Sequence, residues 1–245
     1  MTFSVIIPAR FASTRLPGKL LLDLAGKPIL QHTIERAQAS EASQIVVATD
    51  DKRIAELGES SGASVVMTSP NHATGTDRIQ EAAVSLGLGG EEIVVNVQGD
   101  EPLIPVAAIN QVARNLAQHQ DAGIATLCEE ITDAAEIADP NAVKVVRDEQ
   151  GYALNFSRSP IPHDDASPDL RHIGIYAYRV DFLNRFVQWP QSKPELNERL
   201  EQLRALSHGI KVHAGISSEQ IPPGIDTEKD LEAARKFLTK QGAAT

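Results

Sequence analysis

The sequence of 245 residues predicts an α/β fold with a mostly parallel, doubly wound sheet and a smaller mixed subdomain. Short apolar runs rich in β-branched residues alternate with longer segments of helical periodicity in the first half of the chain. These runs are apolar throughout rather than at every second residue, which is typical of strands covered by helices on both faces. After about residue 120 the alternation stops and strand-like runs follow one another.

The first half of the chain contains the clearest elements. Strands are predicted at 5–7, 45–49, 63–67 and 93–97. Helices are predicted after Pro28 and over 50–60, 74–86 and 106–117. Proline in a first helical turn, and a hydroxyl or acidic residue just before that turn, are the signals that mark these helix starts. Such a sheet binds ligands at the carboxyl ends of its strands.

The second half predicts a hairpin and further strands and helices. The hairpin joins 143–146 to 152–156 through the turn 148–151, and a loop follows at 157–171. A strand at 173–178, helices at about 180–188 and 194–207, a strand at 211–214 and a helix from 227 complete the chain. We interpret 1–245 as one domain in which about 120–215 forms an elaborating subdomain, with a role as a lid or in dimerisation.

The composition argues against several classes of function. The net charge of −10 and the pI near 5.2 disfavour a nucleic-acid binder, because such a protein needs a basic face. Cys128 is the single cysteine, so no disulfide can form within the chain and a cysteine-based zinc site is disfavoured. The chain shows neither a signal peptide nor an apolar run near the roughly 20 residues that span a bilayer. We therefore expect a cytoplasmic protein with no membrane partner.

A basic loop follows the first strand. Arg10, Arg15 and Lys19 lie among small residues, and no acidic residue occurs before Asp23. This local positive charge contrasts with the acidic chain as a whole. A basic, small-residue loop after a buried strand is typical of a phosphate site in α/β proteins. The alternative is that the three cations are ordinary solvated surface residues.

A second cluster, Thr74–Arg78, lies where a helix is predicted to begin. The free N–H groups of a helix N-terminus attract anions. Arg78 is placed either to pair with Asp77 or to contact a ligand. A plain helix cap formed by Thr74 and Asp77 is the alternative.

Two acidic clusters predict a metal site. The segment 96–102 ends a strand and brings Asp100 and Glu101 to the carboxyl edge of the sheet, with a turn and helix cap as the alternative. The segment 223–231 enters the last helix, where a capping box explains Thr227 and Asp230 but not Asp226. A carboxylate that faces phosphate groups is repelled unless Mg²⁺ lies between them. Asp100 and Asp226 are candidate ligands of one ion, although the sequence alone does not bring them together.

Other familiar motifs are missing from the sequence. The histidines show no metal-ligand spacing, Gly18-Lys19 lacks the earlier glycine of a Walker A loop, and no G-x-G-x-x-G pattern occurs. The order of nucleophile, histidine and acid that is typical of a hydrolase is also absent. The sheet is therefore not predicted to bind a dinucleotide.

Taken together, these clusters resemble the 3-deoxy-D-manno-octulosonate cytidylyltransferases, or CMP-KDO synthetases. The resemblance runs nearly end to end, and its most specific segments are IIPARFASTRLPGK, VNVQGDEPLIP, NAVKVV, FSRSPIP, RHIGIYAYR and LEQLR. It implies a fold like that of the nucleotide-diphospho-sugar transferases. It also implies a Mg²⁺-dependent homodimer that transfers CMP from CTP to the acidic sugar KDO, releases pyrophosphate and supplies CMP-KDO for lipopolysaccharide biosynthesis.

The resemblance also implies roles for individual residues. The catalytic residues would be Arg10, Lys19, Asp100 and Asp226, with Asp100 and Asp226 holding Mg²⁺. The residues that contact CTP would be Pro8, Ala9, Arg10, Arg15, Lys19, Gly75, Arg78, Gln98, Gly99 and Asp100. The residues that contact the sugar would be Gln98, Arg158, His172, Tyr176, Glu201 and Gln202.

Periodicity alone predicts a different environment for part of the sugar set. In the helix expected at 194–207, Leu196, Leu200 and Leu203 form the apolar seam. At about 100° per residue Glu201 points roughly 140° away from Leu196. Without the resemblance, Glu201 and Gln202 are interpreted as solvated helix surface, Arg158 as a loop cation, and His172 and Tyr176 as ordinary sheet residues.

Two alternatives to a KDO enzyme stay open. One is a relative that activates another acidic sugar, such as 8-amino-KDO or a sialic acid. Departures from the family pattern at Asn155 and His163 bear on this choice, whereas the FSR, RHIGIY and LEQLR segments favour a KDO-like sugar. The other is a nucleotide-binding protein without turnover, which predicts loss of Lys19, Asp100 or Asp226. All three residues are present.

Overall fold

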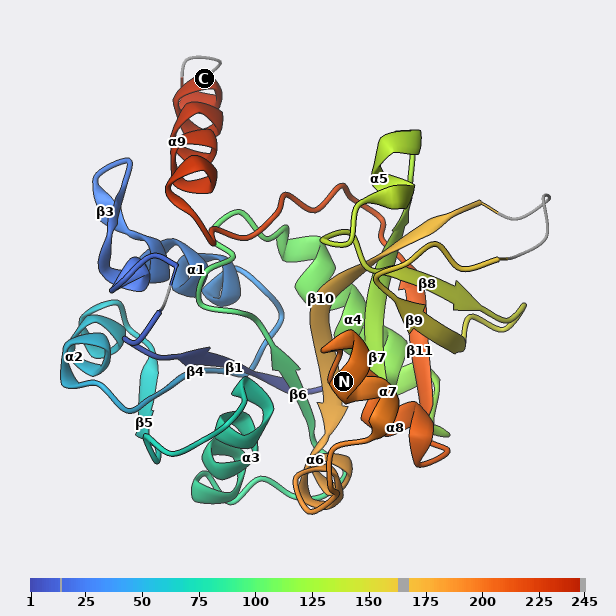
Figure 1. Cartoon of the computed structure of the whole chain (residues 1–245). Coiled ribbons are helices and arrows are strands. Elements are labelled where there is room, and N and C mark those ends of the chain that lie inside the picture. Colours follow the sequence, from blue (N-terminus) through green and yellow to red (C-terminus); the bar gives the residue numbers. More distant parts are fainter. Residues whose placement is uncertain (14, 163–167, 243–245) are drawn as a thin grey trace.

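The computed structural model describes residues 1–13, 15–162 and 168–242, so that His163 lies outside the described residues. Within these ranges nine strands form one mixed sheet, and helices cover both of its faces (Figure 1). The predicted α/β fold with a mostly parallel sheet is confirmed. None of the helices in the described ranges combines the length and the apolar character that crossing a membrane requires.

The elements expected in the first half of the chain are all present. The strands are β1 (Phe3–Ala9), β4 (Gln44–Thr49), β5 (Ser64–Met67) and β6 (Ile93–Asn96). The helices are α1 (Ile29–Gln38), α2 (Lys52–Ser60), α3 (Gly75–Ser85) and α4 (Val106–Gln118). Between β1 and α1 lie a short 3₁₀ helix (Lys19–Leu21) and a small hairpin of β2 (Asp23–Leu24) and β3 (Lys27–Pro28), neither of which the sequence predicted.

The second half of the chain extends the same sheet. Its strands are β7 (Ala122–Glu130), β8 (Lys144–Arg147), β9 (Ala153–Ser157), β10 (Leu170–Arg179) and β11 (Lys211–Ile216). Its helices include α5 (Ala134–Ala138), which the sequence did not predict, α6 (Val180–Phe186) and α9 (Glu228–Gly242). The predicted β8–β9 hairpin is confirmed, since these strands pair antiparallel around a turn whose Gly151 has φ of 86°. A role of 120–215 as a lid or dimerisation subdomain stays a prediction.

The strand order is β11-β7-β10-β6-β1-β4-β5, with β8 paired to β10. Strands β6, β1, β4 and β5 are parallel neighbours, as are β11 and β7. Strand β10 lies between the two groups and runs antiparallel to both β6 and β7. The carboxyl ends of β1 and β6 therefore meet at one edge of the sheet.

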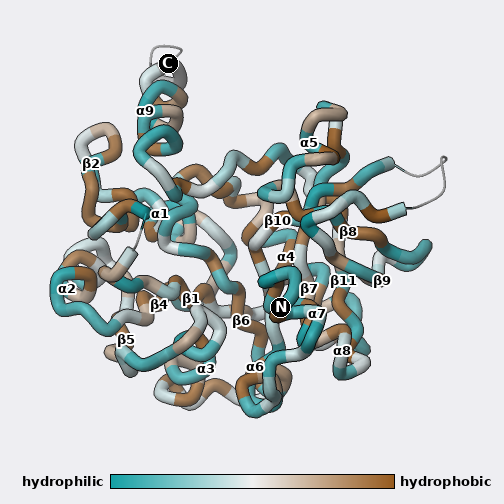
Figure 2. Tube along the Cα trace, viewed as in Figure 1, coloured by the Kyte–Doolittle hydropathy of each residue, from teal (hydrophilic) through white to brown (hydrophobic). Residues whose placement is uncertain are grey.

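Each face of the sheet buries its own core. On β1, Val5 and Ile7 pack with residues of α1 and α4, whereas Ile6 packs on the opposite face with residues of α3 and α6. Alternate residues of a strand point to opposite faces, so a run of apolar residues is needed when both faces are covered. Figure 2 shows hydrophobic colours along β1, β4 and β6.

The prediction of a single helix over 194–207 is wrong. The chain forms α7 (Lys193–Glu198) and α8 (Gln202–Ser207), and Arg199 between them adopts the left-handed conformation with φ of 56°. Leu196, expected in the apolar seam, is 56% exposed, whereas Gln202, expected on the surface, is 4% exposed. The helix break rotates α8, so the periodicity of one continuous helix does not apply.

Two histidines lie in the second half of the sheet, His172 half-buried and His213 buried. The Nε2 atom of His172 on β10 lies 3.0 Å from Thr126 Oγ1 on β7. Burial lowers the pKa of His172 from 6.5 to about 3 and that of His213 on β11 to about 4. Both imidazoles are therefore neutral at pH 7, and protonating either one opposes folding.

Replacing Arg199 with glycine is expected to stabilise the protein by about 0.5–1 kcal/mol. Glycine adopts positive φ without a steric cost. The strain energy that is relieved in the folded state exceeds the free energy that the more flexible unfolded chain gains. Urea unfolding measures the difference, with Arg199→Ala as a control that keeps the strain. Equal stability of the glycine and alanine variants would contradict this account of the helix break.

The free energy of unfolding is expected to fall as the pH is lowered from about 6.5 toward 4. Between these values the unfolded chain binds a proton at position 172 that the folded chain does not, which costs up to about 1.4 kcal/mol per pH unit. Subtracting the urea-unfolding profile of His172→Gln from that of the wild type isolates this contribution. A difference that does not change with pH would show that His172 is not held neutral.

Candidate active site

A cavity of about 430 Å³ opens at the carboxyl ends of β1 and β6. The residues that line it are Pro8, Ala9, Arg10, Ala12, Ser13, Arg15, Lys19, Leu20, His72, Ala73, Thr74, Gly75, Arg78, Gln98, Gly99, Asp100, Glu201 and Asp226. Every residue that the sequence analysis placed around the nucleotide or the metal belongs to this set. The remaining candidates, Arg158, His172, Tyr176 and Gln202, are not in it.

Lys19 is the centre of the hydrogen bonding in this cavity. Its ammonium group donates to Asp100 Oδ2, to Asp226 Oδ1 at 2.9 Å and to the carbonyl of Ile225 at 3.0 Å. Burial by itself would lower the pKa of Lys19, but the attraction of Asp100 and Asp226 outweighs it and the pKa is raised. The amine therefore stays protonated at neutral pH. One cation thus neutralises part of the charge of two carboxylates.

A backbone contact brings Asp226 to Asp100. The segment before α9 crosses the end of β6, where the N–H of Ile225 donates to the carbonyl of Asp100 at 2.8 Å. Gly224 lies so close that a Cβ atom there would be 3.3 Å from the same carbonyl oxygen. On the far side of this crossing, the predicted capping box is confirmed by reciprocal bonds between Thr227 and Asp230. The two candidate metal ligands, Asp100 and Asp226, therefore lie next to each other in the folded chain, on the same ammonium group.

The start of α3 forms a second wall of the cavity. Thr74 and Asp77 form a reciprocal capping box. This confirms the helix cap that the sequence analysis gave as the alternative interpretation of this cluster. Arg78 does not pair with Asp77. Its guanidinium donates to Thr68 Oγ1 and lies 3.3 Å from Asp50 Oδ1. The side chain is thereby held at the cavity wall, although it is buried and its pKa is lowered by that burial.

Glu201 enters the cavity from the turn before α8. Its Oε2 atom accepts a hydrogen bond from Thr76 Oγ1 at 2.5 Å, and the buried Oε1 has no hydrogen-bond partner among the described residues. Burial raises the pKa of Glu201, and the bond from Thr76 and the charge of Arg204 oppose the rise. The interpretation of Glu201 as solvated helix surface is wrong.

The other sugar-site candidates lie beyond the cavity wall. The guanidinium of Arg158 donates to the carbonyls of Glu198 and Pro140, at 2.8 and 2.9 Å. His172 and Tyr176 are neighbours on β10, with ring centroids 5.5 Å apart. Burial raises the pKa of Tyr176, and the charges of Tyr178, Glu201 and Glu101 raise it further. Gln202 is buried with an Nε2 atom that lacks a hydrogen-bond partner among the described residues.

Glu101 follows Asp100 at the sheet edge, where the sequence analysis expected it without assigning it a role. Burial, and then the charge of Asp100, raise its pKa to about 8, so the carboxyl group is neutral at pH 7. Its Oε2 atom has no hydrogen-bond partner in the described part of the chain. The sequence analysis missed His72, which lines the cavity while bonded to Glu81. No local pattern distinguishes His72 from an ordinary loop residue.

The donor set fits a magnesium ion. Asp100 and Asp226 supply carboxylate oxygens, and the Lys19 ammonium between them stands where a cation is required. Mg²⁺ binds through one or two carboxylates and completes its shell with water and substrate phosphates. Among the described residues, no group of three or more His, Cys, Asp or Glu side chains forms a metal site. Two carboxylates beside a cationic phosphate site match this mode of binding.

A larger cavity of about 800 Å³ lies at the opposite edge of the sheet, near the start of β7 and β11. Four of its charged residues pair with each other, since Lys211 lies 2.5 Å from Asp121 and Arg179 lies 3.6 Å from Glu91. The smaller cavity is the better candidate, because it combines several cations, two acids that share one cation and a helix N-terminus.

Comparison with known proteins agrees with this geometry. A family model described as "Cytidylyltransferase" matches residues 4–213. The chain is 53% identical to the 3-deoxy-manno-octulosonate cytidylyltransferase of Marinobacter nauticus over 259 residues, covering 99% of both chains. It is also 53% identical to the enzyme of that name from Saccharophagus degradans, covering 97% of this chain and 99% of the relative.

A solved structure shows the same architecture. It is described as CMP:2-keto-3-deoxy-manno-octonic acid synthetase complexed with CTP. It is 40% identical to this chain, with a TM-score of 0.91, and the match covers 98% of this chain and 99% of that one. The chain therefore belongs to the cytidylyltransferase family, among the 3-deoxy-manno-octulosonate cytidylyltransferases.

Proposed function

We propose that this protein transfers CMP from CTP to KDO, releasing pyrophosphate and forming CMP-KDO. The observation that carries the proposal is the cavity at the carboxyl edge of the sheet, in which Lys19 joins Asp100 and Asp226 beside Arg10 and Arg15. Cations suit a triphosphate, and two acids suit a metal ion on it. The solved relative at 40% identity is described as complexed with CTP, and the curated relatives carry the name of this activity.

We assign roles to the cavity residues by charge and position. Arg10, Arg15 and Lys19 bind the phosphates of CTP and favour the departure of pyrophosphate. Pro8, Ala9, Gly75, Arg78, Gln98 and Gly99 line the space for the nucleotide. Asp100 and Asp226 hold Mg²⁺, which supplies charge neutralisation at the α-phosphate and lowers the pKa of the attacking hydroxyl. Lys19 exchanges its two carboxylate partners for phosphate oxygens when CTP binds.

We place the sugar beside Glu201. Oε1 of Glu201 and Nε2 of Gln202 have no hydrogen-bond partner among the described residues, so they offer an acceptor and a donor. His172 and Tyr176 lie on strand β10. The pKa of Tyr176 responds to Glu201, which supports a shared location. Gln98 lines the cavity on the nucleotide side. Arg158 reaches the sugar carboxylate only if it leaves the carbonyls of Glu198 and Pro140.

We also propose a magnesium-dependent, cytoplasmic homodimer that supplies lipopolysaccharide biosynthesis. The family resemblance is the support for these properties. Exposed Leu154 and Ile216 line one cavity at the β8–β9 hairpin, which supports an interface there. The oligomeric state in solution is measured by analytical ultracentrifugation.

Pyrophosphate release should require CTP, KDO and Mg²⁺, and should fall at least about 100-fold in Asp100→Asn and in Asp226→Asn. Each substitution removes one of the two carboxylate charges that would hold the metal. Asp121→Asn is the matched control, because Asp121 lines the larger cavity at the opposite edge. UTP, ATP, sialic acid and 8-amino-KDO are the substrate controls. Loss of activity in Asp121→Asn alone would move the active site to that cavity.

Replacing Lys19 with methionine should tighten the binding of Mn²⁺ to the nucleotide-free protein and weaken the binding of CTP, each by about tenfold. The variant leaves Asp100 and Asp226 without their shared cation, and it removes a phosphate ligand. Isothermal titration calorimetry measures both constants, with Lys52→Met as an exposed control. Unchanged Mn²⁺ affinity would contradict competition between Lys19 and the metal.

A further inference from the structure

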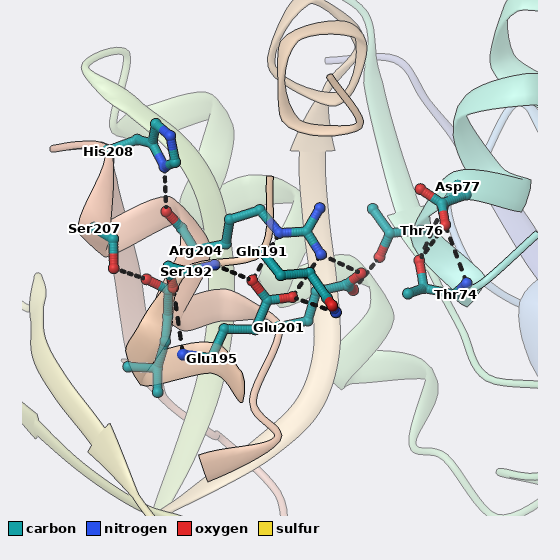
Figure 3. Close-up of polar contacts among 11 residues, drawn as sticks. Thr74, Thr76, Asp77, Gln191, Ser192, Glu195, Glu201, Arg204, Ser207 and His208 are labelled. Atoms are coloured by element: carbon teal, nitrogen blue, oxygen red, sulfur yellow. Dashed lines mark hydrogen bonds and ion pairs between the residues drawn. The ribbon is translucent and has the colours of Figure 1, made fainter. Parts of the chain in front are cut away.

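Glu201 is held between two different partners (Figure 3). On one side Thr76, near the start of α3, donates to Oε2 at 2.5 Å. On the other side Nη2 of Arg204 lies 3.8 Å from Oε1, which is too far for a hydrogen bond. The Oε1 atom is therefore attracted by a positive charge, and this buried atom has no hydrogen-bond partner in the described part of the chain.

Arg204 is kept at this distance by Glu195. Its Nε atom donates to Glu195 Oε2 at 2.9 Å and its Nη2 atom donates to Oε1 at 2.5 Å. The guanidinium also stacks over the ring of Phe186, with 4.4 Å between Cζ and the ring centroid. Arg204 and Glu195 are 5% and 4% exposed. A paired, two-point contact of this kind fixes the direction of the guanidinium.

Glu195 is itself fixed by the start of α7. Its carboxylate accepts a hydrogen bond from the N–H of Ser192 at 3.0 Å, and Ser192 Oγ accepts one from the N–H of Glu195 at 3.3 Å. Gln191 Nε2 donates to Glu195 Oε1 at 3.4 Å. This capping box ties Glu195 to its own backbone, so Glu195 cannot follow Arg204 toward the cavity. Neither Glu195 nor Arg204 lines the cavity.

We propose that Glu195 and Arg204 are positioning residues for Glu201: Glu195 restrains the Arg204 guanidinium, so that Glu201 stays bonded to Thr76 and keeps one oxygen free for hydroxyl groups of the sugar. This inference rests on the proposed function for the identity of that ligand. It links α7 and α8 to α3, the helix that carries Thr76 and forms one wall of the cavity.

The arrangement is a competition between Thr76 and Arg204 for one carboxylate. Without the negative charge of Glu195, the nearest carboxylate available to Arg204 is Glu201. A charged, two-point bond to Arg204 is stronger than the single bond from Thr76, so Glu201 would turn to Arg204. Its Oε1 atom would then be occupied, and the sugar would lose an acceptor.

Kinetic analysis of Glu195→Gln tests the proposal. Glutamine keeps the shape and the capping bonds of Glu195 but removes its charge. The KM for KDO should rise about tenfold, while the KM for CTP changes by less than about twofold. Glu129→Gln, at another largely buried carboxylate paired with an arginine, should leave both constants unchanged. An unchanged KM for KDO, or an equal rise in the control, would overturn the proposal.

A second substitution separates positioning from a loss of packing. The double variant Glu195→Gln, Arg204→Gln removes the competing cation, so the KM for KDO should return toward the wild-type value. A purely structural role predicts a double variant at least as impaired as the single one, and that result would overturn the proposal.

Crystal structures give a readout that does not depend on turnover. In Thr76→Val the buried position keeps its shape but loses the donor to Glu201. The separation of Arg204 Nη2 from Glu201 Oε1 should then shorten from 3.8 Å to hydrogen-bond distance. A Glu201 side chain that does not move would refute the competition, even if Glu195→Gln does not fold. Wild-type protein that releases no pyrophosphate with KDO would refute the proposed function alone.

Discussion

One ammonium group, that of Lys19, joins three segments that are far apart in the chain. It bonds to Asp100 at the end of β6 and to Asp226 and Ile225 before α9, partners that are 81 to 207 residues away. Two carboxylates at this separation repel each other unless a cation lies between them. The need for that cation determines how the basic loop, the sheet edge and the start of α9 fit together. It also makes the site suitable for a reaction between two anionic substrates.

The sheet topology decides where this cation acts. Strands β1 and β6 are parallel, so their carboxyl ends deliver Pro8, Ala9 and Asp100 to one edge. The antiparallel strand β10 ends the parallel run and brings aromatic rings beside that edge. His172, Tyr176 and Tyr178 form consecutive ring contacts along it. Their apolar surroundings explain why protonation of His172, and ionisation of the tyrosines, is unfavourable.

The two halves of the cavity are held in different ways. On the nucleotide side, charged groups contact each other across the chain and are partly open to solvent, as in the Arg15–Asp226 pair. On the side of Glu201, a buried ion pair and a capping box lie behind the group that faces the cavity. A solvated pair rearranges easily when a ligand arrives, whereas a buried pair resists movement because separating it leaves a charge unpaired. The solvated side therefore allows Lys19 to exchange its partners. The buried side keeps the carboxylate of Glu201 in a fixed orientation.

The sequence by itself determined most of the strands and longer helices, the basic loop and the family, because apolar periodicity, helix caps and long motifs are local. Every residue that it assigned to the nucleotide lines the cavity at the carboxyl ends of β1 and β6. Only the tertiary structure decided that Asp226 meets Asp100, that Arg78 pairs with Asp50 rather than Asp77, and that Arg199 breaks the predicted helix. These outcomes depend on contacts between distant segments. The place of Glu201 in the cavity wall follows from them, since no spacing within 194–207 reveals Thr76 across the cavity.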